Sequence, residues 1–296
     1  MKIKFENVNF GSDSGPNSFG KKLHKYLRLN KVDFVDHDYD AVLCFIEDHS
    51  NHSQNNLFQR LDGIYFNKQF DYKLQNFNIE KTYNKATGVI FQSEFNKKLT
   101  EKYFGQHKNS TIIHNGADLN LIKEIKILEN NIIDKYDNVW SCAASWRPHK
   151  RLKDNVRYFM EHRGPNDCLV IAGSPDYHVN DPNIFYAGQV SCEKLISLYK
   201  RSKYFLHLAW LDHCPNVVVD ARAAGCKIIC SSAGGTREIA GKNAVVIEET
   251  EWDFEPVKLY EPPEINFTKK IKNNYESCYD MNEVSKKYLQ FMLVNK

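Results

Sequence analysis

The sequence contains no long apolar run, no CxxC cysteine pair and no strong excess of charge of either sign. The first absence excludes a membrane-spanning helix, which needs about 18 apolar residues. The formal net charge of +3 gives no bulk attraction to nucleic acid. The eight cysteines lie mostly in apolar segments, a pattern typical of reduced thiols rather than zinc ligands or disulfides. These features predict a soluble, cytoplasmic protein with no nucleic-acid partner.

Basic residues gather in two short segments. They are Lys21, Lys22, Lys25 and Arg28 in the first, and Lys97, Lys98 and Lys102 in the second. A basic helix face can contact an anionic membrane, but such a pattern more often marks a solvated helix face. At most, we expect peripheral contact with a membrane.

Short apolar segments alternate with amphipathic helical patterns along most of the chain, which is typical of parallel sheets covered by helices. The expected strands are 2–8, 41–46, 57–61, 89–91, 111–114, 139–144, 168–172, 184–187, 204–209, 227–230 and 244–247. The polar segment 117–137 reads as a helical connection. We predict an α/β protein with Rossmann-like domains at 1–130 and 131–280, doubly wound and facing a central cleft. A C-terminal helix at 281–296 could pack back on the first domain.

The segment 212–225, Asp-His-Cys-Pro-Asn-Val-Val-Val-Asp-Ala-Arg-Ala-Ala-Gly, carries the strongest functional pattern. Pro215 suits the first position of a helix, and Gly225 is typical of a residue just past a helix end. The start of this helix, at Asn216 and Val217, would offer free backbone N–H groups and a positive dipole end. Such a helix start suits a phosphate group.

Two carboxylates flank that helix start. Asp212 precedes the helix, and Asp220 lies about two turns into it, so that its side chain would lean back toward the same end. Together they could hold hydroxyl groups on either side of a bound diphosphate, as a sugar nucleotide requires. By itself, the pattern fits a structural interpretation equally well, in which Asp212 caps the helix and Asp220 is solvated.

Fixed cations follow the first strand of the second domain. Arg147 and Lys150 lie on the loop after 139–144, where they could neutralise a departing diphosphate without a metal ion. The acidic segment 36–40 precedes a strand instead of ending one, so we interpret it as a solvated loop and predict no metal site.

The turn 11–20, with Gly15, could approach a phosphate. Its glycine spacing is not that of a dinucleotide fingerprint, which disfavours a nicotinamide dehydrogenase.

These motifs, together with Cys226-Lys-Ile-Ile and Ser232-Ala-Gly-Gly-Thr-Arg-Glu-Ile, resemble the family-four retaining glycosyltransferases, which have the GT-B fold. The resemblance covers most of residues 1–247. The family carries two acidic residues, usually Glu, separated by seven residues; this chain has Asp212 and Asp220. The resemblance implies that Asp212 contacts the transferred sugar and Asp220 the ribose.

The resemblance also implies roles for other positions. Lys150 would contact the diphosphate, with Arg147 lying two positions after the usual Arg. Asp62 stands about where many members have a His that contacts the sugar. The implied contacts with the nucleotide base and the donor phosphate involve Gly188, Gln189, Val190 and Gly15.

The implied activity is retaining, metal-independent transfer of a hexose-type sugar from a nucleotide diphosphate sugar to a glycan or lipid-linked glycan, with no cofactor. Two alternatives stay open: a GT-B sugar-nucleotide epimerase, and a non-catalytic relative that binds sugar nucleotides or glycans.

Several polar residues also have structural interpretations. Asp62 could equally form a salt bridge with Arg60, because alternate residues of a strand share one face. Glu94 follows Ser93 at a helix start and suits the helix dipole, and we expect Glu238 to secure local structure. Of the histidines near apolar strands, we interpret His114 and His207 as core residues and expect a functional effect only from His213.

Overall fold

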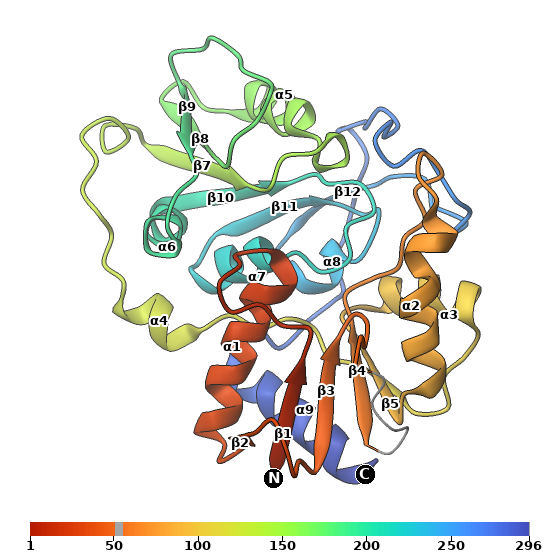
Figure 1. Cartoon of the computed structure of the whole chain (residues 1–296). Helices are drawn as coiled ribbons and strands as arrows, with labels where there is room; N and C mark the ends of the chain where they lie inside the picture. Colours follow the sequence, from red (N-terminus) through yellow and green to blue (C-terminus); the bar gives the residue numbers. More distant parts are fainter. Residues whose placement is uncertain (51–55, 296) are drawn as a thin grey trace.

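The computed structural model describes residues 1–50 and 56–295, and its strands form two sheets, one in each half of the chain (Figure 1). The first sheet is parallel, in the order β2-β1-β3-β4-β5-β6. Its strands are β1 (Lys2–Glu6), β2 (Asp33–Phe34), β3 (Ala41–Phe45), β4 (Leu57–Leu61), β5 (Gly88–Phe91) and β6 (Ser110–Ile112). Its helices are α1 (Gly15–Leu29), α2 (Tyr72–Lys85) and α3 (Glu94–Phe104).

The second sheet has the order β13-β12-β11-β10-β7-β8-β9 and is parallel except for β13. Its strands are β7 (Asn138–Ala143), β8 (Asp167–Ala172), β9 (Ile184–Gly188), β10 (Ser202–His207), β11 (Lys227–Ser231), β12 (Val245–Ile247) and β13 (Lys270–Ile271). The elements around it are α4 (Leu119–Glu124), the short 3₁₀ helix η1 (Pro148–Lys150), α5 (Leu152–His162), α6 (Cys192–Arg201), α7 (Asn216–Ala223) and α8 (Thr236–Ile239). The last helix is α9 (Met281–Val294).

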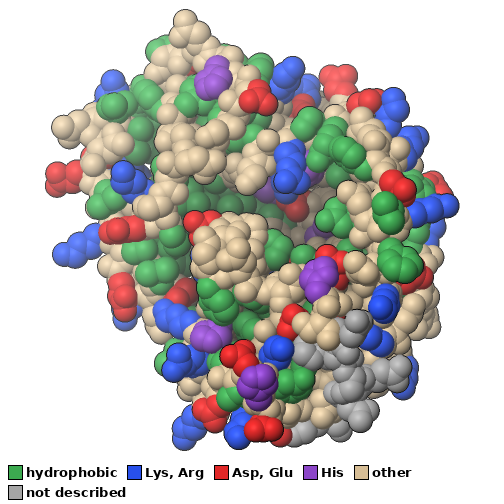
Figure 2. Space-filling model, in the orientation of Figure 1, with side chains coloured by type: hydrophobic (Ala, Val, Ile, Leu, Met, Phe, Trp, Pro, Cys, Tyr) green, Lys and Arg blue, Asp and Glu red, His purple; other side chains and the backbone are tan. Residues whose placement is uncertain are grey.

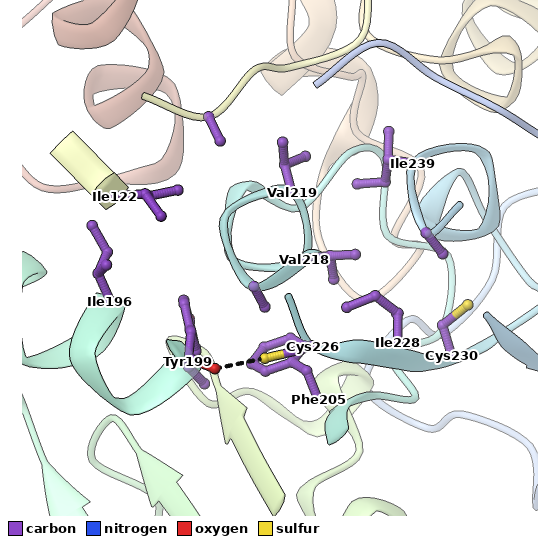
Figure 3. Packing of buried hydrophobic residues seen from close by; sticks show 14 of the residues in the cluster. Ile122, Ile196, Tyr199, Phe205, Val218, Val219, Cys226, Ile228, Cys230 and Ile239 are labelled. Carbon is purple, nitrogen blue, oxygen red and sulfur yellow. Dashed lines mark hydrogen bonds between the residues drawn. The ribbon is translucent and has the colours of Figure 1, made fainter. Parts of the chain in front are cut away.

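Each sheet is buried by apolar side chains from the helices that cover it. On one face of the second sheet, Phe205 and Ile228 pack against Val218 of α7 and Tyr199 of α6 (Figure 3). The opposite face packs against α5. The last helix, α9, packs with α1 in the core of the first half, although about 250 residues separate the two helices in the sequence. The prediction of an α/β fold with two doubly wound sheets is confirmed.

Several boundaries differ from those expected. Helix α1 begins at Gly15, inside the segment 11–20 that was expected to form a turn, and Pro215 is the N-cap of α7 rather than its first residue. Only 119–124 of the expected helical connection is an α-helix. Helix α2 was not predicted, because Leu74 and Phe77 are exposed and leave a weak amphipathic pattern. Within the described residues, no helix is long and apolar enough to cross a membrane.

Candidate active site

The carboxyl ends of β7 and β10 form the switch point of the second sheet. The chain passes from β7 to β8 on one side, whereas β10 pairs with β7 on the other. Ligands of open α/β sheets bind at such points, because the loops leave the two strands in opposite directions. The loop after β7 carries Lys150, and the loop after β10 carries Asp212. The tertiary structure therefore brings together two residues that the sequence analysis had chosen separately.

The Asp212 carboxylate is the centre of a compact charged cluster. Its Oδ2 accepts hydrogen bonds from Lys150 Nζ at 2.5 Å and from His207 Nε2 at 2.9 Å, and its Oδ1 accepts the backbone N–H of His213 at 3.0 Å. Burial alone would raise the pKa of Asp212, but Lys150 and the hydrogen bond from His207 hold this pKa well below its usual value. Asp212 is therefore a carboxylate at neutral pH.

Three histidines surround this cluster, and burial lowers the pKa of each. The pKa of His149 falls to about 3 and that of His213 to about 4, with Lys150 adding to the effect of burial in both cases. Burial also lowers the pKa of His207, although its hydrogen bond to Asp212 opposes the shift. We had interpreted His207 as a core residue; it is buried, but it contacts the candidate catalytic acid directly. The alternation of a buried strand gives no signal for this contact.

The start of α7 faces the glycine-containing turn of the first half. Asn216 Nδ2 donates a hydrogen bond to the backbone oxygen of Gly15 at 2.8 Å. Pro215 has no N–H, and the backbone N–H groups of Asn216 and Val217 make no hydrogen bond to any described residue. Free N–H groups at a helix start suit an anion. The surface is hollowed between the two halves on the face shown in Figure 2.

Asp220 points to the other half of the chain. Its Oδ1 lies 3.1 Å from Lys22 Nζ on α1, and both side chains are partly buried. In this arrangement, the carboxylate expected to hold the ribose is bound to a lysine. Its role as a ribose contact stays a prediction.

The remaining predicted contacts lie on loops at the same edge of the sheet. Arg147 is exposed at the start of η1 and forms no ion pair within the described residues. Gly188 ends β9 with a φ of 64°, which glycine adopts without strain, and Gln189 and Val190 follow it. No contact between these residues and Asp212 is present in the described structure.

Asp62 takes part in a polar network in the core of the first half. Arg60 is fully buried, lies 4.1 Å from the centroid of the Phe19 ring, and donates to Asp62 and to Asn115 Oδ1. Gln92 also donates to Asp62. The expected Arg60–Asp62 salt bridge is therefore present. A catalytic role for Asp62 stays a prediction.

Glu238 joins the two halves of the chain. Its carboxylate accepts the backbone N–H groups of Glu94 at 2.7 Å and Phe95 at 2.9 Å, at the start of α3, and accepts from His114 Nε2 at 3.1 Å when that nitrogen carries the proton. Glu238 therefore has the structural role expected for it, and this role links the second half of the chain to the start of α3 in the first half. His114 is half-buried and contacts this carboxylate, so it is not a purely apolar core residue.

A cavity of about 660 Å³ lies beside the cluster, between the start of α3 and the segments that follow β11 and β12. Trp210 and Leu211 form part of its wall, but Lys150, Asp212 and Asp220 do not line it. We place the candidate site at the charged cluster, because the complementary charges and the free N–H groups are there.

A family match covers the segment that carries this cluster. Residues 123–254 match the family described as Glycosyl transferases group 1, and this segment contains Lys150, Asp212 and Asp220. This part of the chain is similar to a group 1 glycosyltransferase domain. No curated protein matches the chain in sequence.

Solved glycosyltransferases share the fold along the whole chain. HepE from Anabaena, in complex with UDP-glucose, is 13% identical over 99% of this chain and 100% of its own, with a TM-score of 0.65. Sucrose-phosphate synthase from Thermosynechococcus elongatus is 11% identical over 99% and 97%, with a TM-score of 0.64. WaaG, a glycosyltransferase involved in lipopolysaccharide biosynthesis, is 11% identical over 99% and 93%, with a TM-score of 0.57. The chain thus has the GT-B fold of these glycosyltransferases along its whole length, and residues 123–254 match the group 1 glycosyltransferase family.

Proposed function

We propose that the protein is a glycosyltransferase that transfers a hexose, with retention and without a metal ion, from a UDP-sugar such as UDP-glucose to a glycan or lipid-linked glycan. The observation that carries the proposal is the contact between Lys150 and Asp212 at the switch point of the second sheet. A cation that could bind the diphosphate then lies beside a carboxylate that could bind the sugar. The complex of HepE with UDP-glucose supports uridine as the base, and the described role of WaaG supports a glycan acceptor.

The diphosphate would bind between Lys150 and the free N–H groups of Asn216 and Val217. Hydrogen-bond donors and cations that face a developing negative charge stabilise a departing phosphate. Arg147, exposed on the same loop as Lys150, would reach the outer oxygens of the diphosphate. The turn at Gly15 would close the site from the first half, since Asn216 already contacts it.

Asp212 would accept hydrogen bonds from hydroxyl groups of the transferred sugar, and Asp220 from those of the ribose. Asp220 must then exchange its partly buried ion pair with Lys22 for the ribose hydroxyl groups. The backbone at Gly188, Gln189 and Val190 would contact the base. Asp62 would face the acceptor side of the reacting sugar.

The central test measures nucleotide binding and turnover in matched variants. Lys150→Met should weaken UDP binding about tenfold to a hundredfold, because a hydrogen bond to a charged group contributes about 1.5–3 kcal/mol. Asp212→Asn should reduce turnover more than UDP affinity, and Asp220→Ala should do the reverse. Lys242→Met serves as the control, since that side chain is 64% exposed in a different part of the second half. Unchanged affinity and turnover in the first three variants would refute the site.

Three further measurements test the finer claims. Among UDP, GDP and ADP, UDP should give the largest rise in melting temperature. Transfer should continue in excess EDTA, and the product should keep the anomeric configuration of the donor. Conversion of the donor without any acceptor would instead indicate an epimerase, and binding without turnover would indicate a non-catalytic relative.

A further inference from the structure

Two partners share one oxygen of Asp212, and they differ in how freely they can move. Oδ2 accepts from Lys150 Nζ at 2.5 Å and from His207 Nε2 at 2.9 Å. Lys150 is on a flexible four-carbon stem beside the cleft, with 19% of its side chain exposed. His207 ends the central strand β10, and only 5% of its side chain is exposed. Lys150 can therefore leave Asp212, whereas His207 is fixed beside it.

The proposed function, on which this inference rests, gives Lys150 a second anion to bind. When its ammonium group turns to the donor diphosphate, the buried Asp212 carboxylate loses its cation and gains a negatively charged neighbour. A buried carboxylate without a compensating charge is strongly unfavourable. The neutral imidazole of His207 donates one hydrogen bond to Asp212 but supplies no charge.

We propose that His207 takes up a proton from solvent when Lys150 leaves Asp212 for the donor diphosphate, so that donor binding is coupled to proton uptake. The proton binds at Nδ1, since Nε2 already donates to Asp212. The imidazolium then replaces the ammonium group as the counter-charge of Asp212. His207 acts through Asp212 and is therefore a positioning residue rather than a catalytic one.

The surroundings of His207 contain few groups that could interfere. The groups that act on it or lie next to it are Asp212 and His213 on the following loop, Lys150 and His149 on η1, the Cys230 thiol on β11, and Arg151, which donates to the backbone oxygen of Leu208. His213 is neutral near pH 7, because burial lowers its pKa to about 4. Arg151 is paired with Glu249, to which it donates two hydrogen bonds, and the Glu249 carboxylate neutralises its charge. His149 is neutral near pH 7, because burial lowers its pKa to about 3. Lys150 and Asp212 are therefore the charges that control His207.

The sign of the pH effect follows from these charges. In the ligand-free protein, burial lowers the pKa of His207 and Lys150 lowers it further, so the ring is neutral near pH 7. Once Lys150 has moved away, Asp212 raises that pKa. Donor affinity should then increase as the pH falls from the pKa of His207 in the donor-bound protein to its pKa in the ligand-free protein. For one coupled proton, the limit is about tenfold per pH unit.

The first experiment uses the ligand-free protein and does not depend on the proposed function. The titration of His207 is followed by NMR in the wild type and in Lys150→Met. Removal of the lysine charge should raise the pKa of His207 by about one unit or more. An unchanged titration would overturn the coupling, even if the protein binds UDP-sugars well.

The second experiment measures proton uptake during UDP-glucose binding, by calorimetry in buffers with different ionisation enthalpies. The wild type should take up a substantial fraction of one proton near pH 7. His207→Gln keeps an amide donor for Asp212 but cannot titrate, so its uptake should be lost and its affinity should depend less on pH. His178→Gln, at an exposed histidine outside the site, should behave like the wild type.

The outcomes separate the two proposals. Equal proton uptake in the wild type and in His207→Gln would overturn the role of His207, because another group would then take up the proton. If no nucleotide or nucleotide sugar binds, the proposed donor site fails, while the ligand-free titration still decides whether Lys150 controls His207.

Discussion

The contact between Glu238 and the start of α3 gives the sharpest prediction about stability. The first three backbone N–H groups of this helix are satisfied from both halves of the chain. Ser93 Oγ accepts the N–H of Asn96 at 3.1 Å, while Glu238, only 3% exposed, accepts those of Glu94 and Phe95. A helix otherwise leaves these groups without partners.

The size of the effect follows from these hydrogen bonds. Glu238→Ala leaves the buried N–H of Phe95 and the partly buried N–H of Glu94 unpaired, at a cost of about 1–3 kcal/mol for a buried group, and removes a negative charge from a helix start. We expect a total loss of about 3–4 kcal/mol in the free energy of unfolding. Glu238→Gln keeps one accepting oxygen and should lose about 2 kcal/mol.

The assay is urea unfolding followed by circular dichroism, with Glu248→Gln as the matched control because its side chain is exposed. The control should remain within about 0.5 kcal/mol of the wild type. Ser93→Ala should destabilise by about 1 kcal/mol, and the double variant with Glu238→Gln should reveal coupling at the shared helix start. A Glu238→Ala variant within about 0.5 kcal/mol of the wild type would refute the reasoning.

Two further predictions concern buried charge. Arg60→Met should cost about 3–5 kcal/mol in the free energy of unfolding, because Asp62 is left in the core without its cation; a loss below about 1 kcal/mol, as expected for the exposed control Lys21→Met, would contradict this. For His149, the unfolded chain takes up a proton below about pH 6.5, whereas the folded protein takes it up only near pH 3. Its contribution to stability is therefore complete above pH 6.5 and falls by about 1.4 kcal/mol per pH unit below it. Between pH 6 and pH 5, the free energy of unfolding should change less steeply with pH in His149→Gln than in the wild type. An equal pH dependence in the two proteins would contradict the assignment.

The periodic parts of the fold could be predicted from the sequence. Buried parallel strands such as 41–45 and 168–172 are almost continuous apolar runs, and this pattern is visible without any tertiary contact. Helix α2 was missed because two of its apolar residues, Leu74 and Phe77, are exposed rather than gathered on a buried face. The two-residue strands β2 and β13 are too short to produce a period.

The candidate site was only partly predictable for a related reason. Lys150 and Asp212 stood out because each lies on a loop after an expected strand, next to other recognisable residues. His207 did not, since a histidine in a buried strand looks the same in sequence whether or not it meets a carboxylate. Lys22 was noted only as part of a basic helix face, because nothing local links it to Asp220, 198 residues away.

The sequence by itself determined the two doubly wound sheets, the helix start at Asn216 and the two carboxylates around it, because each of these is recorded in the spacing of neighbouring residues. Only the tertiary structure decided which partners those carboxylates have. Asp212 binds Lys150 and His207, Asp220 binds Lys22, and Glu238 caps α3. Such contacts depend on how distant strand ends and helix starts meet across the two halves, and short-range periodicity carries no information about that meeting.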